Sequence, residues 1–287
     1  MSERTLDSVK GPASLAGNLS TGILKLIALV FMFIDHSGKV LFNNLYEMRV
    51  LGRIAFPVFV WCMIVGFQRT RSVPRYLLRI FLVGLVSQPL YLLALNTEMN
   101  LGKLIGDTVA PLASGFSFGG LWQVLYTVFL EKPNIFLTLL LGLSVLWGVR
   151  EKKWLSHLWA PALGVILATV LKADYGWKAI VFFVMFYAVR GSRPGIAAVM
   201  ISFFLFWGSA YQPPSSLFGI PLNYSSMPDF LSNPLKAFFR LETFAILSLP
   251  FILIRFPRDL RLPKWAGYSL YPAHLVLLIV LKLLCAH

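Results

Sequence analysis

One apolar stretch decides the fold: Lys25-Leu-Ile-Ala-Leu-Val-Phe-Met-Phe-Ile-Asp35-His36-Ser37-Gly38-Lys39. It is long enough to enter a bilayer, yet an acid and an imidazole interrupt its second half. A charged side chain in the middle of a membrane helix costs roughly 2.5–3.5 kcal/mol on insertion scales, so such a residue is by default a candidate for function. His36 and Asp35 are therefore the leading candidates for a catalytic pair.

Lys25 and His36 are eleven residues apart. At about 100° per residue this separation is three turns plus about 20°, so both side chains belong to one helix stripe, roughly 16 Å apart along the axis. A neutral imidazole at membrane depth can accept a proton near neutral pH. Asp35 would orient it or compensate its charge. In the alternative, Asp35 pairs with Lys39, and His36 only hydrogen-bonds a carbonyl group.

The composition is that of an integral membrane protein. Of the 287 residues, 57% are hydrophobic and 13% are charged, whereas about 25% of a soluble domain is charged. Lys and Arg number 26, against 12 Asp and Glu. In a membrane protein this excess gathers in cytoplasmic loops and sets orientation, and it would attract an anionic cofactor such as coenzyme A. Neither a nucleic-acid partner nor a metal is expected.

The hydropathy pattern predicts an all-α membrane helix bundle with about nine transmembrane helices. A helix that spans a bilayer needs about 20 mostly apolar residues. The segments that approach this criterion lie near 23–43, 50–68, 76–95, 134–150, 155–171, 177–190, 195–211, 239–255 and 267–285. With a cytoplasmic N-terminus, twelve cations fall in the inner loops and five in the outer connections, as the positive-inside rule requires.

The domain organisation that follows is simple. Residues 1–22 are expected to form a polar cytoplasmic tail, and residues 23–287 a single membrane domain. Two outer connections are long. Residues 96–133 contain the apolar run 121–130, which is too short to span and is expected to lie in the interface or to re-enter. Residues 212–238 hold five prolines and are expected to form an irregular outer cap, because proline interrupts helices.

Further cations lie close to the first helix. Arg53 belongs to the second predicted span and needs a counter-ion, for which Asp35 and Glu47 are candidates; it either contacts a ligand or forms a structural ion pair. Arginine binds phosphate bidentately, so a cluster at the inner ends of the second and third spans suits a nucleotide phosphate, although the positive-inside rule alone also explains it. The cluster consists of Arg69, Arg71, Arg75 and Arg79.

Candidate contacts for an acceptor lie toward the outer face. His274, which follows Tyr271 near the start of the last span, is either a second polar group in a cavity or a packed histidine. Asp174 lies in an outer turn. Glu242, at the start of the eighth span, is expected to pair with Arg240 or another cation.

Several of these segments resemble the TraX family. They are Leu24–His36 with its Ile-Asp-His end, Leu51–Phe59 with Gly-Arg-Ile-Ala-Phe-Pro, Tyr76–Arg79, Asn134–Gly142 and Tyr271–Leu275. The family is known for acetylating the N-terminus of conjugative pilin with acetyl-CoA. It is similar to a wider superfamily of transmembrane acyltransferases, whose first helix carries a basic residue, ten further residues and a histidine. The resemblance implies His36 as the catalytic residue, Lys25 as a contact to coenzyme A, and a place for Arg53 in the site.

The resulting hypothesis is a multi-pass acetyltransferase of the bacterial inner membrane. It would move an acetyl group from cytoplasmic acetyl-CoA to an amine or hydroxyl at the outer face, on a pilin N-terminus, a glycan or a lipid. His36 would deprotonate the acceptor, and an acetyl-histidine intermediate is also compatible with the sequence. Two other classes fit the same residues: a proton-coupled carrier, which also places Asp, His and Arg inside a bundle, and a non-catalytic pilus assembly factor.

Overall fold

The computed structural model describes residues 15–285 except 97–98, 114–116, 258–259 and 261–262. Helices account for most of these residues, which confirms the all-α class. The α-helices are α1 (Thr21–Val40), α2 (Tyr46–Gly52), α3 (Ala55–Arg69), α4 (Val73–Leu95), α5 (Leu101–Ala113), α6 (Phe118–Leu125), α7 (Ile135–Glu151), α8 (Ser156–Val170), α9 (Gly176–Ala188), α10 (Arg193–Gly208), α11 (Asp229–Phe238), α12 (Leu249–Leu253) and α13 (Lys264–Cys285). Shorter elements are the π-helix η1 (Tyr126–Leu130) and the 3₁₀-helices η2 (Lys153–Leu155), η3 (Tyr224–Ser226) and η4 (Leu241–Ser248). Strands β1 (Ser216–Leu217) and β2 (Ile220–Pro221) form a small antiparallel hairpin with Ser216 opposite Pro221.

Each of the nine segments predicted as a span is helical over most of its length. Among the described residues, three helical stretches are long and apolar enough to cross a membrane: Tyr46–Arg69, Val73–Leu95 and Gly267–Cys285. A fourth qualifies if the bent pair Phe118–Leu130 and Ile135–Glu151 counts as one span. Other apolar helices, such as α9 and α10, have only 10–17 residues. The protein is therefore a helical membrane protein, and the number nine and the orientation remain predictions.

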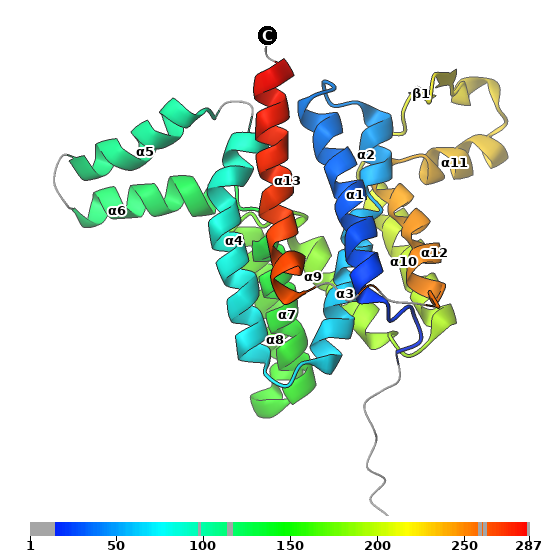
Figure 1. Cartoon of the computed structure of the whole chain (residues 1–287). Helices are drawn as coiled ribbons and strands as arrows, with labels where there is room; N and C mark the ends of the chain where they lie inside the picture. Colours follow the sequence, from blue (N-terminus) through cyan, green and yellow to red (C-terminus); the bar gives the residue numbers. More distant parts are fainter. Residues whose placement is uncertain (1–14, 97–98, 114–116, 258–259, 261–262, 286–287) are drawn as a thin grey trace, which may run out of the picture.

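The long helices run roughly along one direction, so the bundle has two ends (Figure 1). One end holds the start of α1, the connection between α3 and α4, and the connection between α7 and α8. The other end holds the α1–α2 connection and the C-terminal end of α13. Asp35 and His36, in the last turns of α1, thus lie toward the opposite end from Lys25 and the arginines between α3 and α4.

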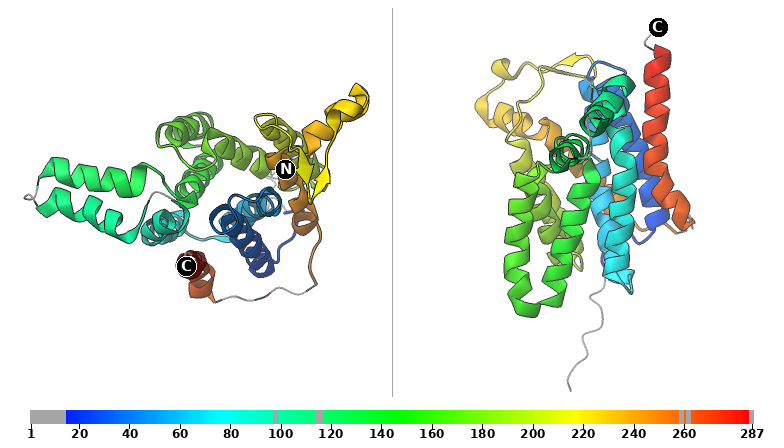
Figure 2. Two further views of the ribbon diagram at one scale, coloured as in Figure 1. Left: turned by 90° about the horizontal axis from the view of Figure 1, so that it is seen from above. Right: turned by 90° about the vertical axis from the view of Figure 1, so that its left-hand side faces the viewer.

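Helix α1 packs against α2, α3, α4 and α13 (Figures 1 and 2). Its residues Leu24 and Ala28 are fully buried and belong to the main apolar core, together with Trp61 and Phe67 of α3 and Phe186 of α9. Because these two residues lie on one face of α1, the neighbouring face that carries Lys25 is left for the space between α1, α3, α4 and α13.

The last residues of the predicted N-terminal tail pack against the bundle. The backbone N–H of Ala16 donates to the carbonyl oxygen of Arg190 at 2.9 Å, and that of Asn18 donates to Ile252 at 2.6 Å. The indole N–H of Trp61 donates to the carbonyl oxygen of Asn18 at 2.7 Å. Residues 15–20 therefore anchor the start of α1, whereas residues 1–14 lie outside the described part of the chain.

The connection 96–133 forms a lateral hairpin. Helices α5 and α6 lie beside each other and project away from the bundle (Figures 1 and 2). The segment Phe118–Leu130, made of α6 and η1, meets α7 at 85°. The apolar run 121–130 thus lies across the direction of α7, and its interfacial or re-entrant placement stays a prediction.

The connection 212–238 extends from the opposite side of the bundle (Figures 1 and 2). The prediction of an irregular cap is wrong for its second half, which forms helix α11 with Pro234 inside it. The helix starts where the carbonyl oxygen of Pro228 accepts the N–H groups of Leu231 and Ser232 at 3.0 Å. Proline removes one helical hydrogen bond, and because Pro234 is exposed, water can satisfy the carbonyl that loses its partner.

Candidate active site

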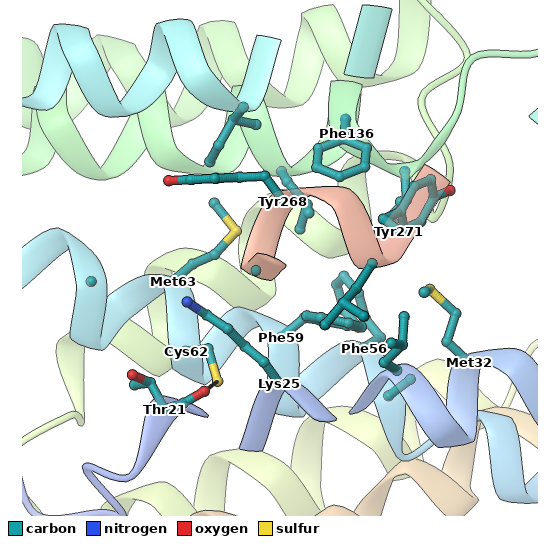
Figure 3. A pocket seen from close by; sticks show the side chains of 18 of the residues that line it. Thr21, Lys25, Met32, Phe56, Phe59, Cys62, Met63, Phe136, Tyr268 and Tyr271 are labelled. Atoms are coloured by element: carbon teal, nitrogen blue, oxygen red, sulfur yellow. Dashed lines mark hydrogen bonds between the residues drawn. The ribbon is translucent and has the colours of Figure 1, made fainter. Parts of the chain in front are cut away.

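A cavity of about 900 Å³ lies between α1, α3, α4 and α13 (Figure 3). At one end it is lined by cations, namely Lys25, Arg69, Arg71, Arg75 and Arg79. At the other end it is lined by Asp35, His36, Lys39, Arg49, Arg53, Asp174 and Tyr175. Apolar side chains such as Leu29, Met32 and Phe59 lie between the two ends. One continuous space therefore joins the two groups of polar residues.

Five of the α1 residues that line this cavity form one stripe. They are Lys25, Leu29, Met32, His36 and Lys39, spaced alternately four and three residues apart, as neighbours on one helix face are. Lys25 extends from α1 into the pocket beside Cys62 and Met63 of α3 (Figure 3). The predicted shared stripe of Lys25 and His36 is thus confirmed.

His36 contacts a second histidine. Its Nδ1 atom lies 3.0 Å from Nε2 of His274 on α13, and the two rings are stacked with centroids 5.2 Å apart and planes inclined by 23°. His274 is only 6% exposed, and the ring of Tyr271 packs edge-on against it at 4.8 Å. The alternative in which His36 hydrogen-bonds only a carbonyl group is therefore wrong, because its Nδ1 atom contacts His274. Among the described residues, His36 lines the cavity and His274 does not.

Asp35 belongs to a buried ion network. Its Oδ1 atom accepts from Nε of Arg49 at 2.9 Å and from Nη2 of Arg53 at 2.8 Å. The Nη1 atom of Arg53 donates to Oε1 of Glu242 at 2.9 Å, and the exposed fractions of these two side chains are 6% and 5%. Arg53 therefore joins three elements, α1, α2 and η4, through charge-assisted hydrogen bonds.

This network settles several alternatives that the sequence left open. Among the described residues, Asp35 is paired with Arg49 and Arg53, so the alternative in which it pairs with Lys39 is wrong. Glu242 pairs with Arg53 instead of Arg240, and it does not line the cavity.

Arg49, one of the five cations predicted in outer connections, is not among the predicted site residues. Arg49 and Arg53 are four residues apart, so they lie on one helical face. That spacing was the available signal. Of the two partners considered for Arg53, Asp35 is confirmed; Glu47 instead accepts the backbone N–H of Phe218 at 3.0 Å.

The contact between α1 and α2 depends on Gly52. A Cβ atom at this position would overlap the Cβ of Asp35 and stand 2.6 Å from its Oδ1. Only glycine lets the two helices approach closely enough for Asp35 to reach both arginines.

Replacing Gly52 by alanine should push α2 away from Asp35. Overpacking of this kind costs about 1–3 kcal/mol, so a lower thermal unfolding temperature in detergent is expected. Gly106→Ala is the matched control, because a Cβ at Gly106 on α5 has no neighbour within 4 Å. Equal melting temperatures for the two variants would contradict the close contact.

Asp174 and Tyr175 reach the cavity from the connection between α8 and α9. Oδ1 of Asp174 accepts the N–H of Tyr175 at 3.1 Å, and the ring of Tyr175 packs on that of Phe56 with centroids 4.4 Å apart. Burial raises the pKa of the Asp174 carboxyl above its usual value, and the positive Arg53 opposes this shift, because removal from water disfavours the charged form. Asp174 and Tyr271, which the sequence indicated as candidate contacts for an acceptor, both line the cavity.

The described residues contain no group of three or more His, Cys, Asp or Glu side chains that could hold a metal ion. At the end near Asp35, the cavity offers an imidazole beside ion pairs. The cations at the other end are suited to an anion.

Fold and site together define a helical membrane protein with a cavity that leads from a cluster of cations, past apolar side chains, to a histidine. The model of the family described as TraX protein matches residues 20–282. The chain belongs to the TraX family.

Two curated relatives share short segments with the chain. One is described as a probable fimbrial assembly protein, FimC, of Dichelobacter nodosus; it is 33% identical over 72 residues, which are 24% of this chain and 30% of the relative. The other is an uncharacterised protein of Rickettsia prowazekii (strain Madrid E), 46% identical over 46 residues, or 16% of this chain and 18% of that protein. The chain thus spans less than a third of the length of either relative. No solved structure matches the chain. The family and the fimbrial relative fit a pilus-related function.

Proposed function

We propose that this protein is an acetyltransferase of the bacterial inner membrane, with nine spans and a cytoplasmic N-terminus. It would transfer an acetyl group from cytoplasmic acetyl-CoA to an acceptor at the outer face, a pilin N-terminus being the favoured one. The observation that carries the proposal is the single cavity that connects Lys25 and the arginine cluster to His36.

The cationic end of the cavity suits the donor. Coenzyme A carries its phosphates at one end and its thiol at the other, joined by the pantetheine arm. Arginine binds phosphate with two parallel hydrogen bonds, and Arg69, Arg71 and Arg75 are exposed at this end. The apolar middle of the cavity would hold the arm. The thioester would then meet His36, roughly 16 Å from Lys25 along α1.

The reaction needs one group that accepts and returns a proton. The amine or hydroxyl of the acceptor attacks the thioester carbonyl, and a C–N or C–O bond forms while the C–S bond breaks. His36 takes the proton from the nucleophile and passes it to the leaving sulfur, so the products are the acetylated acceptor and coenzyme A with a free thiol. The cavity would hold both reactants in contact, which removes much of the entropic barrier.

Asp174 and Tyr271 are the residues proposed to bind the acceptor, because they line the same cavity as His36. A carboxyl group there can pair with the ammonium form of a peptide N-terminus before that amine loses its proton. Membership of the TraX family, which is known for acetylating a pilin N-terminus, favours a peptide amine, whereas a glycan or lipid hydroxyl would also reach an outward-facing site.

The test uses purified full-length protein in lipid nanodiscs with acetyl-CoA labelled in the acetyl group. The acceptor is a synthetic peptide with the pilin N-terminal sequence, and the same peptide with a blocked N-terminus is the control. Label on the free peptide and an equal release of thiol support the proposal. Flux driven by a pH gradient without thioester loss would favour a carrier. A protein that leaves acetyl-CoA intact yet is needed for pilus formation would favour an assembly factor.

Lys25→Ala is expected to weaken donor binding specifically through the phosphates. A hydrogen bond to a charged group contributes about 1.5–3 kcal/mol, so KM for acetyl-CoA should rise roughly 10- to 100-fold while kcat changes little. With S-acetylpantetheine, which lacks the phosphates, wild type and variant should have the same kcat/KM. Lys103→Ala, a change at an exposed lysine of α5 away from the cavity, is the control. An equal loss with both donors would contradict the assignment.

A further inference from the structure

His274 is placed where it can control which nitrogen of His36 carries a proton. The two side chains come from α1 and α13, helices that pack against each other (Figure 2). Nδ1 of His36 faces Nε2 of His274 at 3.0 Å, which leaves Nε2 as the ring nitrogen of His36 available to the cavity. His36 lines that cavity, so the two nitrogens have different environments.

When both imidazoles are neutral, a hydrogen bond at this distance needs a proton on one of the two facing nitrogens and a lone pair on the other. If His274 donates, neutral His36 carries its proton on Nε2, and that atom cannot take a proton from an acceptor. If His36 donates from Nδ1, its Nε2 presents a lone pair to the cavity. Only the second arrangement lets neutral His36 act as a general base at the atom that a substrate can reach.

Asp35 is held toward other partners, since its carboxylate pairs with Arg49 and Arg53. Its Oδ1 atom already accepts hydrogen bonds from Arg49 and Arg53. In the observed arrangement the group against Nδ1 of His36 is the ring of His274. When His36 gains a proton during the reaction, its Nδ1–H would donate to His274 as a charge-assisted hydrogen bond, which is stronger than a neutral one.

The position of His274 is well supported by packing. The ring of Tyr271 packs edge-on against His274, and that of Phe136 on α7 packs edge-on against Tyr271 with centroids 4.7 Å apart. Leu275 and Leu278 of α13 are fully buried in the same cluster. This packing holds α13 in one register against α1 and keeps His274 at its distance from His36.

We propose that His274 is a positioning residue that holds His36 with its proton on Nδ1 and thereby presents the Nε2 lone pair to the acceptor. This inference rests on the proposed acetyl transfer. The sequence predicted His274 as a candidate contact for the acceptor. In the role proposed here, His274 instead acts through His36 and contacts no substrate.

The test compares His274→Gln with His274→Leu in the full-length protein. The glutamine side-chain oxygen can accept the Nδ1–H of His36, whereas leucine fills similar space without an acceptor. His274→Leu should lower kcat about 100-fold, near the lower end of what a general base contributes, and leave KM for acetyl-CoA unchanged. His274→Gln should recover most of the loss. Equal activities for the two folded variants would overturn the proposal.

A second measurement does not need acetyl transfer. The ¹⁵N chemical shifts of labelled histidine distinguish a protonated ring nitrogen from a bare one, and His36→Ala assigns the signals. In wild type, His36 should have a protonated Nδ1 and a bare Nε2, and His274→Leu should alter this. The opposite tautomer in wild type would overturn the inference. The expected tautomer in a protein that leaves acetyl-CoA intact would instead contradict the proposed function.

Discussion

His36→Ala is expected to abolish acetyl transfer while the protein still folds. The variant loses the group that would take the proton from the nucleophile, and general acid–base catalysis contributes about 10²–10⁴-fold to a rate. The effect should appear in kcat, measured as labelled acetyl transferred to the acceptor peptide, with little change in KM for acetyl-CoA because the cations at the far end of the cavity are untouched.

The control for this change is His157→Ala. His157 lies on α8 and, among the described residues, is not part of the lining of the cavity. Both variants should purify with the same yield and similar unfolding temperatures. A folded His36→Ala protein that retains acetyl transfer would rule out the role assigned to His36.

Arg53→Met is expected to have the largest effect on stability. Removing one partner of a buried ion pair leaves an uncompensated charge and typically costs about 3–5 kcal/mol. Glu242 would lose Arg53 as its ion-pair partner, while Asp35 would keep Arg49. A strongly lowered midpoint of thermal unfolding in detergent is the expected result.

Two further variants make this prediction specific. Arg49→Met should cost less, because Arg49 is more exposed than Arg53, at 21% against 6%, and Asp35 keeps Arg53. The double variant Arg53→Met with Glu242→Gln should regain part of the lost stability, since it removes the unpaired carboxylate. Arg53→Met and Arg49→Met melting at the same temperature would contradict the central position of Arg53.

The lining of the cavity by α1 could be predicted from the sequence. Lys25, Met32 and His36 share a face because the helical repeat is a property of the backbone that is independent of neighbouring helices. The nine segments predicted as spans all proved helical. Helix α11 is different, because it lies in a connection that was predicted to be irregular. This helix accommodates Pro234 because it is exposed, so that water can replace the missing hydrogen-bond partner.

The sequence alone indicated which residues are candidates for the chemistry: an imidazole and an acid within an apolar helix, and a cation on the same helix stripe as the imidazole. Only the tertiary structure decided which partners those residues have. Asp35 meets Arg53 from 18 residues away, Arg53 meets Glu242 from 189, and His36 meets His274 from 238. Each helix sets the directions of its own side chains, but which directions face one another depends on how the helices pack, and that depends on contacts made along the whole chain.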